Sequence, residues 1–205
     1  MAKQIKYAFH LTHIDNMPHI VRYGLACTTS LLHDEHHVSI GDNQVINRRN
    51  ESSVNDNRLS DFIPFYFGPR SPMLYVIQHG YNGVHRVKPE NIVYCVVGID
   101  DIIKDNVDCI FTDGQALSGL TTFYKKNQLS HLNDIVKYDD VYSSQWNLES
   151  DLDLKRRKEA ELLIKQNLAP KYVKGYVVYN DTAKQRLVNT GVALEKIFVA
   201  PSYYF

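Results

Sequence analysis

The chain has 205 residues, of which 44% are hydrophobic and 22% are charged, with 10 glycines and 7 prolines. This composition excludes disordered, collagen-like and coiled-coil proteins, and the length predicts one domain over residues 1–205. Lysine plus arginine and aspartate plus glutamate each number 23, which excludes a strongly basic nucleic-acid-binding chain but not a locally basic groove.

The first half of the chain is expected to contain a strand, a short helix and then a polar region. Residues 5–12 indicate the strand, and Asp15 or Asn16 can cap a helix that Gly24 ends. Residues 28–43 are polar and show no periodicity, which is typical of an irregular segment. A short helix is expected at 45–49 and a turn at 52–57. Two apolar runs follow, at 63–67 and 73–78, and the second is favoured as a strand.

The second half contains the clearest buried strand, the apolar run IVYCVVGI at 92–99. Further strands are expected at 109–113, 175–180 and 196–205, and helices at 122–136, 155–167 and 182–191. The helix at 155–167 has an alternative, a strand at its centre, because AELLI has no decisive period. Since strands and helices do not alternate strictly, the predicted fold class is α+β and not a doubly wound sheet.

The cysteines and the first residues of the chain indicate the cellular compartment in which the protein is expected. Cys27, Cys95 and Cys109 are odd in number and widely spaced, so no disulfide framework or cysteine-based zinc site is expected. The first residues lack a signal-peptide apolar run, and no segment approaches 18 apolar residues. We therefore expect a cytoplasmic protein with no membrane partner. Neither a Rossmann glycine motif nor a P-loop occurs.

Two histidine-containing segments are candidates for binding. His10 and Thr12 lie two residues apart on the first expected strand, so both point to the same face. They could hydrogen-bond a ligand amide or ribose hydroxyl, or form a satisfied polar pair at a strand end. The run HDEHH at 33–37 has metal-ligand residue types, but neighbours in an extended chain point apart, so a solvated loop is favoured and no metal is expected.

Three further features could carry chemistry. Arg48 and Arg49 suit phosphate binding, although paired arginines are often surface charge. The block at 61–75 is rich in aromatics, and it forms either a rigid core loop or a wall for stacking flat rings beside Arg70. The four cations at 155–158 oppose a helix macrodipole, which weakly indicates a functional cause, and Glu161 beside the apolar run is the carboxylate best placed for burial.

Taken together, the segments His10–Asn16, Asn47–Asn50, Asp61–Tyr75 and Arg157–Leu163 resemble the DarT toxins. Gly24-Leu25 and Phe111–Gly114 fit between them in order and rough spacing, so the resemblance covers most of the chain. Within Asp61–Tyr75, PFYFGPRSPMLY is the most specific part. Leu162 departs from the pattern, because an aromatic residue is expected there.

This resemblance implies an NAD-dependent ADP-ribosyltransferase with a split β core of two small sheets and NAD in the cleft between them. It implies transfer to a DNA base, mostly thymine in single strands, by a toxin whose partner antitoxin carries a DarG-like macrodomain. The implied catalytic residues are Arg49 and Glu161. The implied NAD-binding residues are His10, Leu11, Thr12, His19, Ala26, Arg49 and Tyr66, and the DNA-binding candidates are Arg48, Arg70 and Met73. Residues 116–160 would contact the substrate, and residues 30–48 would fold over NAD.

The chemistry of that reaction is consistent with these residue types. Breaking the nicotinamide–ribose bond develops positive charge on the ribose, which a carboxylate such as Glu161 stabilises. The attacking thymine nitrogen must lose its proton, and the resemblance assigns Arg49 to assist that loss. Arg49 is a poor free base, since its pKa lies above about 12, so stabilising a deprotonated ring or the pyrophosphate is the easier role. Three alternatives remain open: transfer to guanine, RNA, a terminal phosphate or protein; a non-enzymatic nucleic-acid-binding module; and a metal hydrolase built on HDEHH.

Overall fold

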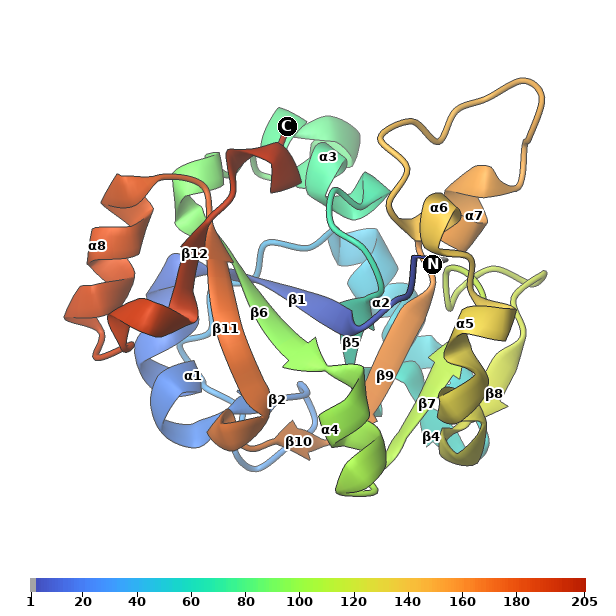
Figure 1. The fold of residues 1–205 in the computed structure, drawn as a ribbon, viewed down its shortest axis with the longest axis horizontal. Coiled ribbons are helices and arrows are strands. Elements are labelled where there is room, and N and C mark those ends of the chain that lie inside the picture. The colour runs from blue at the N-terminus through green and yellow to red at the C-terminus, as the bar shows by residue number, and fades with distance from the viewer. Residues whose placement is uncertain (1–2) are drawn as a thin grey trace.

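The computed structural model describes residues 3–205 and is organised around one mixed sheet (Figure 1). The sheet has eight strands in the order β12-β11-β6-β1-β5-β9-β7-β8, and β11 and β12 are its parallel pair. In chain order these strands are β1 (Tyr7–His13), β5 (Phe62–Tyr66), β6 (Ile92–Gly98), β7 (Cys109–Thr112), β8 (Phe123–Lys125), β9 (Glu161–Lys165), β11 (Val173–Val178) and β12 (Ile197–Val199).

The sheet is nearly divided between β1 and β5. These strands share a single register pair, Phe9 with Tyr66, whereas β1 pairs with β6 along its whole length and β5 pairs with β9 from Phe62 to Tyr66. The two halves, β12-β11-β6-β1 and β5-β9-β7-β8, therefore meet at one point, which is the split β core that the sequence resemblance implies.

Helices and two short strand pairs surround the sheet. The helices are α1 (Met17–Tyr23), α2 (Asn43–Glu51), α3 (Pro72–His79), α4 (Ile99–Lys104), α5 (Leu132–Ile135), α6 (Tyr138–Val141), α7 (Leu154–Lys158) and α8 (Asp181–Asn189). Two small pairs of strands, β2 (Leu25–Ala26) with β10 (Asn167–Leu168) and β3 (Ser53–Val54) with β4 (Asn57–Arg58), lie outside the main sheet. Helix α8 lies beside β11 and β12, and α5 to α7 lie toward the β9-β7-β8 half (Figure 1).

The core lies on both faces of the sheet. Every residue of β6 is buried, and its alternating side chains enter two apolar clusters. Val93, Cys95 and Val97 belong to the larger cluster, while Tyr94 packs with Leu74 of α3 in the second. The continuous apolar run of β6 thus reflects burial on both faces. None of the helices within residues 3–205 has the length and apolar character needed to cross a bilayer.

The strand expected at 73–78 is wrong, because this segment is helix α3. The Ser71 side chain caps the helix by accepting a hydrogen bond from the Leu74 N–H at 3.2 Å. Pro72 occupies the first turn, where its fixed φ favours a helix, and Gly80 ends it with φ of 71°. The start and stop signals outweighed the apolar, aromatic composition of the run.

Three other expectations also need correction. Residues 122–136 are not one helix, since β8 pairs with β7 there before a 3-10 turn and α5. The helix expected at 155–167 ends at Lys158, and β9 follows, as in the alternative reading. The terminal strand spans only Ile197–Val199, because Pro201 begins a 3-10 turn.

Candidate active site

Glu161 is fixed from three sides at the start of β9, with only 2% of its surface exposed. Its Oε2 accepts a hydrogen bond from Arg49 Nη1 at 2.9 Å, and its Oε1 accepts one from the Ala116 main-chain N–H at 2.9 Å. Its own main-chain N–H donates to Thr112 Oγ1 at 3.0 Å. The carboxylate is therefore held in one position, and Arg49 compensates its charge.

Arg49 reaches this carboxylate from the last turn of α2. The helix begins at an Asp42 cap, whose side chain accepts from the Gln44 N–H, and a cation near its other end complements the helix dipole. Arg49 Nη2 is buried and has no hydrogen-bond partner within residues 3–205. Because an unpaired buried donor is costly, this nitrogen marks a place for an acceptor atom of a ligand.

His10 of β1 presents a neutral imidazole to a narrow cavity. Its Nδ1 lies 2.8 Å from the Pro64 carbonyl oxygen, which can only accept, so Nδ1 carries the proton and Nε2 is an acceptor. Burial lowers the pKa of His10 to about 4, so the ring is neutral at pH 7. The cavity, of about 30 Å³, is also lined by His19 and Ala26, which brings three of the predicted NAD-binding residues together.

The neighbours of His10 on β1 have different surroundings. Thr12 is buried and accepts a hydrogen bond from Asn16 Nδ2 at 3.0 Å. The Leu11 side chain packs in the second apolar cluster with Leu74, so only its main chain is available to a ligand. Since β1 pairs with β5 only at Phe9, one edge of β1 beyond that residue has no ladder partner within residues 3–205.

The irregular segment 28–42 folds over the His10 cavity. Asn16 fixes it twice, by donating to the Val38 carbonyl oxygen at 3.0 Å and accepting from the Val38 N–H at 2.8 Å. His19 Nε2 lies 3.0 Å from the Leu32 carbonyl oxygen. The HDEHH run belongs to this cover, and across residues 3–205 no group of three or more candidate ligands is placed to hold a metal.

A larger cavity, of about 740 Å³, has four aromatic rings and two cations in its lining. The rings are Tyr75, Tyr81, Trp146 and Phe205, and the cations are Arg70 and Lys155. The Arg70 guanidinium carbon lies 4.5 Å from the centroid of the Phe205 ring, and its buried Nε has no partner within the described residues. Flat rings with an incompletely paired arginine form a surface suited to stacked bases and phosphate.

Tyr66 and Met73, two further predicted site residues, contact each other beside Glu161, and Arg48 lies elsewhere. Tyr66, opposite Glu161 in the sheet register, donates its hydroxyl to Met73 Sδ at 3.5 Å. Burial, followed by the charges of Glu159 and Glu161, raises the pKa of Tyr66 well above its usual value, so the hydroxyl remains protonated. Arg48 is exposed and donates to the Leu117 carbonyl oxygen at 3.5 Å, away from the Arg70 cavity.

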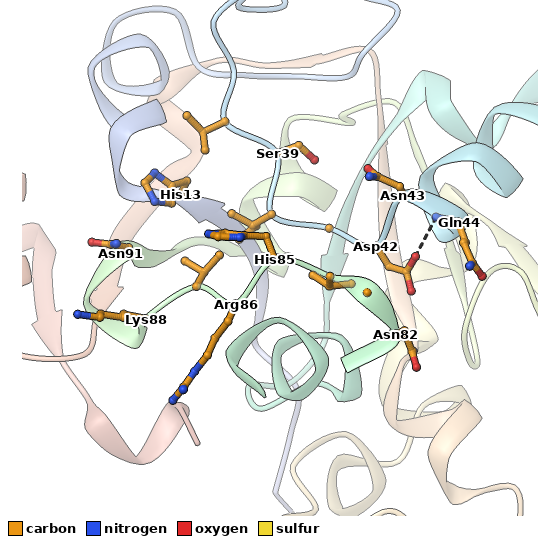
Figure 2. Close-up of a pocket in the computed structure, with 16 residues that line it drawn as sticks. His13, Ser39, Asp42, Asn43, Gln44, Asn82, His85, Arg86, Lys88 and Asn91 are labelled. Carbon is orange, nitrogen blue, oxygen red and sulfur yellow. Dashed lines mark hydrogen bonds between the residues drawn. The ribbon is translucent and has the colours of Figure 1, made fainter. Parts of the chain in front are cut away.

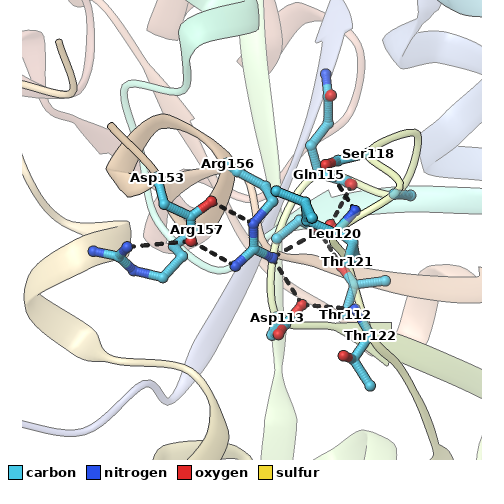
Figure 3. A network of polar contacts seen from close by, with 12 residues as sticks. Thr112, Asp113, Gln115, Ser118, Leu120, Thr121, Thr122, Asp153, Arg156 and Arg157 are labelled. Carbon is cyan, nitrogen blue, oxygen red and sulfur yellow. Dashed lines mark hydrogen bonds and ion pairs between the residues drawn. The ribbon is translucent and has the colours of Figure 1, made fainter. Parts of the chain in front are cut away.

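The cations at 156 and 157 are paired with aspartates (Figure 3). Arg156 binds Asp153 through Nε and Nη2, at 2.7 and 2.8 Å, and Asp113 through Nη1, at 3.0 Å. Arg157 binds Asp140 and Asp151 at 2.7 and 2.6 Å. These ion pairs explain two of the four cations structurally, and the buried Lys158 donates to the Val141 carbonyl oxygen at 3.1 Å. Because α7 has five residues, the opposing dipole is small.

Another cavity, of about 700 Å³, lies between the segments 38–44 and 82–91 (Figure 2). Its charged lining residues are Arg86 and Lys88, with Asp42 on the α2 side, so the net charge of the lining is positive, and His13 and His85 also line it. Asn82 lines both this cavity and the aromatic one. The sequence patterns did not indicate this basic surface, because its residues come from three separate segments.

Some residues of the site were missed from the sequence. The Ala116 N–H acts through its main chain, so no side-chain pattern could identify it. Trp146 is the only tryptophan of the chain, which was a usable signal. Glu159 is also buried, two residues before Glu161, whereas the sequence singled out Glu161 alone for burial.

Sequence comparison gives consistent matches over nearly the whole chain. The family model described as "ssDNA thymidine ADP-ribosyltransferase, DarT" matches residues 9–205. A DNA ADP-ribosyl transferase of Escherichia coli O127:H6 is 31% identical over 183 residues, covering 87% of this chain and 83% of that protein. A DNA ADP-ribosyl transferase–DNA ADP-ribosyl glycohydrolase fusion protein of Thermosipho africanus is 28% identical, covering 100% of this chain and 51% of the fusion.

Solved structures show the same fold. Thermus sp. 2.9 DarT in complex with ADP-ribosylated ssDNA has a TM-score of 0.86 at 23% identity, covering 100% of this chain and 99% of that chain. The complex of the same protein with NAD+ has a TM-score of 0.82 at 22% identity, covering 100% of both chains. These likenesses confirm the predicted α+β class and ADP-ribosyltransferase fold.

Proposed function

The chain belongs to the DarT family, and from this premise we propose that it transfers ADP-ribose from NAD to thymine in single-stranded DNA. It acts as the toxin of a toxin–antitoxin pair. The observation that carries the proposal is the buried contact between Arg49 and Glu161 at the junction of the two sheet halves. We propose that residues 1–205 form one catalytic domain, since the family match spans residues 9–205.

Glu161 stabilises the positive charge that develops on the nicotinamide-bearing ribose of NAD. Its position is fixed before the reaction by Arg49 and the Ala116 N–H, so little reorganisation is needed when the charge appears. Arg49 keeps a second nitrogen, Nη2, for the substrate. The guanidinium remains charged throughout, so it binds the pyrophosphate or the deprotonated thymine ring and does not act as the base.

The cavity at His10 is assigned to NAD. The neutral His10 Nε2 can accept a hydrogen bond from a ribose hydroxyl, and the free edge of β1 offers main-chain groups to an amide. His19 and Ala26 line the same cavity, and the segment 28–42 covers it. Because this cavity holds about 30 Å³, the cover must move outward for NAD to enter.

The aromatic cavity is assigned to the DNA strand. Tyr75, Trp146 and Phe205 provide faces on which bases can stack, and Arg70 and Lys155 can meet phosphate oxygens. Pro72 and Tyr75 of α3 line this cavity. Met73 of the same helix contacts Tyr66, which lies opposite Glu161 in the sheet register, so α3 connects the cavity to the catalytic pair. Nucleotides that leave it past Asn82 would reach the basic cavity at Arg86 and Lys88 (Figure 2).

The partner is assigned by the chemistry of the product. The Thermosipho relative carries a glycohydrolase on the same chain, so we infer that a DarG-like macrodomain hydrolase removes the ADP-ribose that this chain attaches. We also propose a cytoplasmic location, because both NAD and DNA are found there and the three cysteines are unpaired and buried.

One experiment tests this function against its nearest alternatives. The protein is incubated with NAD and, in separate reactions, a thymine-containing DNA strand, a thymine-free strand, RNA and a protein mixture, and the products are weighed by mass spectrometry. We expect a mass gain of one ADP-ribose on the thymine strand alone. A gain on the thymine-free strand, RNA or protein, with none on the thymine strand, would contradict the acceptor assignment.

A further inference from the structure

A lysine ammonium is buried next to the aromatic cavity. Lys158, the last residue of α7, has only 1% of its surface exposed. Its Nζ donates to the Val141 carbonyl oxygen at 3.1 Å and to the Pro69 carbonyl oxygen at 3.4 Å. It also lies 5.9 Å from the centroid of the Trp146 ring. Both acceptors are uncharged, and burying an ammonium against neutral groups costs free energy, so stability alone does not explain a lysine here.

The peptide group that leads into Arg70 is held from both sides. Its carbonyl oxygen, which belongs to Pro69, accepts from Lys158, and its N–H, which belongs to Arg70, donates to the Tyr94 hydroxyl oxygen at 3.2 Å. Tyr94 is 1% exposed, and its hydroxyl donates in turn to the Tyr203 carbonyl oxygen at 2.9 Å. Two buried side chains therefore restrict the rotation of this peptide.

Arg70 depends on that restraint, because its backbone lies in the left-handed region with φ of 54°. A residue with a β-carbon persists there only where its surroundings enforce the conformation. In this conformation the guanidinium faces the Phe205 ring and lines the aromatic cavity. A different φ would redirect the side chain, so the peptide held by Lys158 determines where Arg70 points.

The second acceptor of Lys158 fixes another wall of the cavity. Val141 ends α6, which lies beside α7, and residues 144–147 of the segment that follows line the cavity (Figure 1). The chain at Val141 also approaches Gly68 closely, since a β-carbon there would lie 2.1 Å from the Val141 carbonyl oxygen. One ammonium thus joins α7, the turn before Arg70 and the end of α6.

We propose that Lys158 is a positioning residue of the DNA site, which fixes the Pro69–Arg70 peptide and the end of α6 before a strand binds. This inference rests on the proposed function. Lys158 is too deeply buried to touch the strand. It acts through Arg70, which meets a phosphate, and through Trp146, on which a base stacks. Groups that are already in place bind a flexible strand more tightly, because less side-chain freedom is lost on binding.

The charge of Lys158 favours an anion in the same cavity. Burial first, and then the Arg70 charge, lower the pKa of Lys158 to about 8, while Glu159 raises it. The ammonium is therefore still charged at pH 7, and it repels the Arg70 guanidinium in the free protein. A strand phosphate at Arg70 attracts both cations and offsets this repulsion.

The test is a double-mutant cycle between Lys158→Met and Arg70→Ala in the full-length protein. Methionine keeps the apolar stem but removes the charge and the N–H donors. We expect Lys158→Met to raise the Kd and the KM for a thymine strand about tenfold, with little change in the KM for NAD or in NAD hydrolysis without DNA. In the Arg70→Ala background the same change should raise the strand Kd by at most about threefold, because the positioned cation is already gone.

Trp146 gives an independent spectroscopic readout, since it is the only tryptophan of the chain. Removing the charge near its ring should shift the indole emission of the free protein. Lys104→Met, at an exposed lysine of α4, is the matched control and should alter neither emission nor strand affinity. Thermal unfolding checks folding, and if Lys158→Met is unfolded the cycle is run with Lys158→Gln, which retains an N–H donor and should weaken strand binding at least about threefold.

Each contrary result has a distinct meaning. Wild-type strand affinity in a folded Lys158→Met or Lys158→Gln variant would overturn the positioning role. An undiminished loss in the Arg70→Ala background would also overturn it, because Lys158 would then act independently of Arg70. Equal losses in strand binding, NAD binding and NAD hydrolysis would indicate a general structural role instead. A wild-type protein that hydrolyses NAD but neither binds nor modifies a thymine strand would overturn the proposed function, and this inference with it.

Discussion

At the residue scale, Glu161 contributes charge that matters most in the transition state. Replacing it with glutamine keeps an acceptor for Arg49 but removes the negative charge beside the ribose. We expect Glu161→Gln to lower transfer by at least about 10²- to 10³-fold, while NAD affinity changes little. Initial rates and a calorimetric NAD titration check this together. Wild-type turnover in the variant would end the catalytic assignment of Glu161.

Glu159 also makes a prediction about stability. Its pKa is about 8 in the folded protein and near its ordinary value of 4.5 in the unfolded chain, so the folded state holds the proton more tightly. The stabilisation of the folded state by this tighter proton binding is complete below pH 4.5 and is lost as pH rises through 8. We therefore expect the Glu159→Gln variant to become more stable than wild type as the pH rises. The difference between their free energies of unfolding should grow by up to about 1.4 kcal/mol per pH unit over that range.

Urea unfolding of the two proteins at pH 5, 7 and 9 measures this difference in stability. It should grow with pH between the first two values and level off above about 8. A difference that is constant with pH would show that Glu159 titrates normally in the folded protein. Because this measurement requires neither NAD nor DNA, it tests the environment of Glu159 in the free protein.

At the element scale, the segment 30–48 is expected to respond to NAD. Its first part has no helix or strand, and the contacts described above to Asn16 and His19 are few. Segments with few buried contacts open readily, so a ligand beneath them should slow amide exchange. We expect hydrogen–deuterium exchange in this segment to slow when NAD is added. Identical exchange with and without NAD would contradict the covering role.

Arg156 positions the loop that supplies the Ala116 N–H to Glu161. It joins Asp113, at the start of that loop, to Asp153 before α7 (Figure 3). We expect Arg156→Ala to lower kcat by about tenfold with little change in the KM for NAD, because displacing one hydrogen-bond donor lowers transition-state stabilisation. Arg156→Lys should recover only part of the loss, since lysine cannot bind two carboxylates through a planar fork.

Steady-state rates with varied NAD separate the two kinetic parameters of these variants. A rise in KM with unchanged kcat would contradict the positioning role of Arg156, since it would place the effect on NAD binding. Thermal unfolding serves as the control for folding, because breaking partly buried ion pairs costs some stability in either case.

Much of the element pattern could be predicted, and the failures have physical causes. Strand β6 was evident because burial on both faces produces a continuous apolar run. Helix α3 was missed because Tyr75, Val76 and Ile77 favour strands, although Ser71, Pro72 and Gly80 mark its ends. The contact between Arg49 and Glu161 joins residues far apart in the chain, so only the family resemblance pointed to it, and the geometry now supports it.

At the scale of the whole molecule, positive charge is concentrated in one cavity although the net charge of the chain is zero. Arg70 and Lys155 lie with four aromatic rings in one cavity. This arrangement suits exposed bases, which can stack, better than a duplex, whose bases are already stacked and paired. The balance of charges excluded only a strongly basic chain. The local surface became visible when the fold brought separate segments together.

The most direct test of the account compares initial rates of ADP-ribosylation on a thymine-bearing single strand and on the same strand annealed to its complement. The pairing edge of thymine is occupied in the duplex, and exposing it costs a few kcal/mol, or roughly two orders of magnitude in rate. We predict rapid modification of the single strand, slow modification of the duplex, and none without NAD. Equal rates on both substrates would contradict the account, because the acceptor atom would then be one that remains exposed in paired DNA.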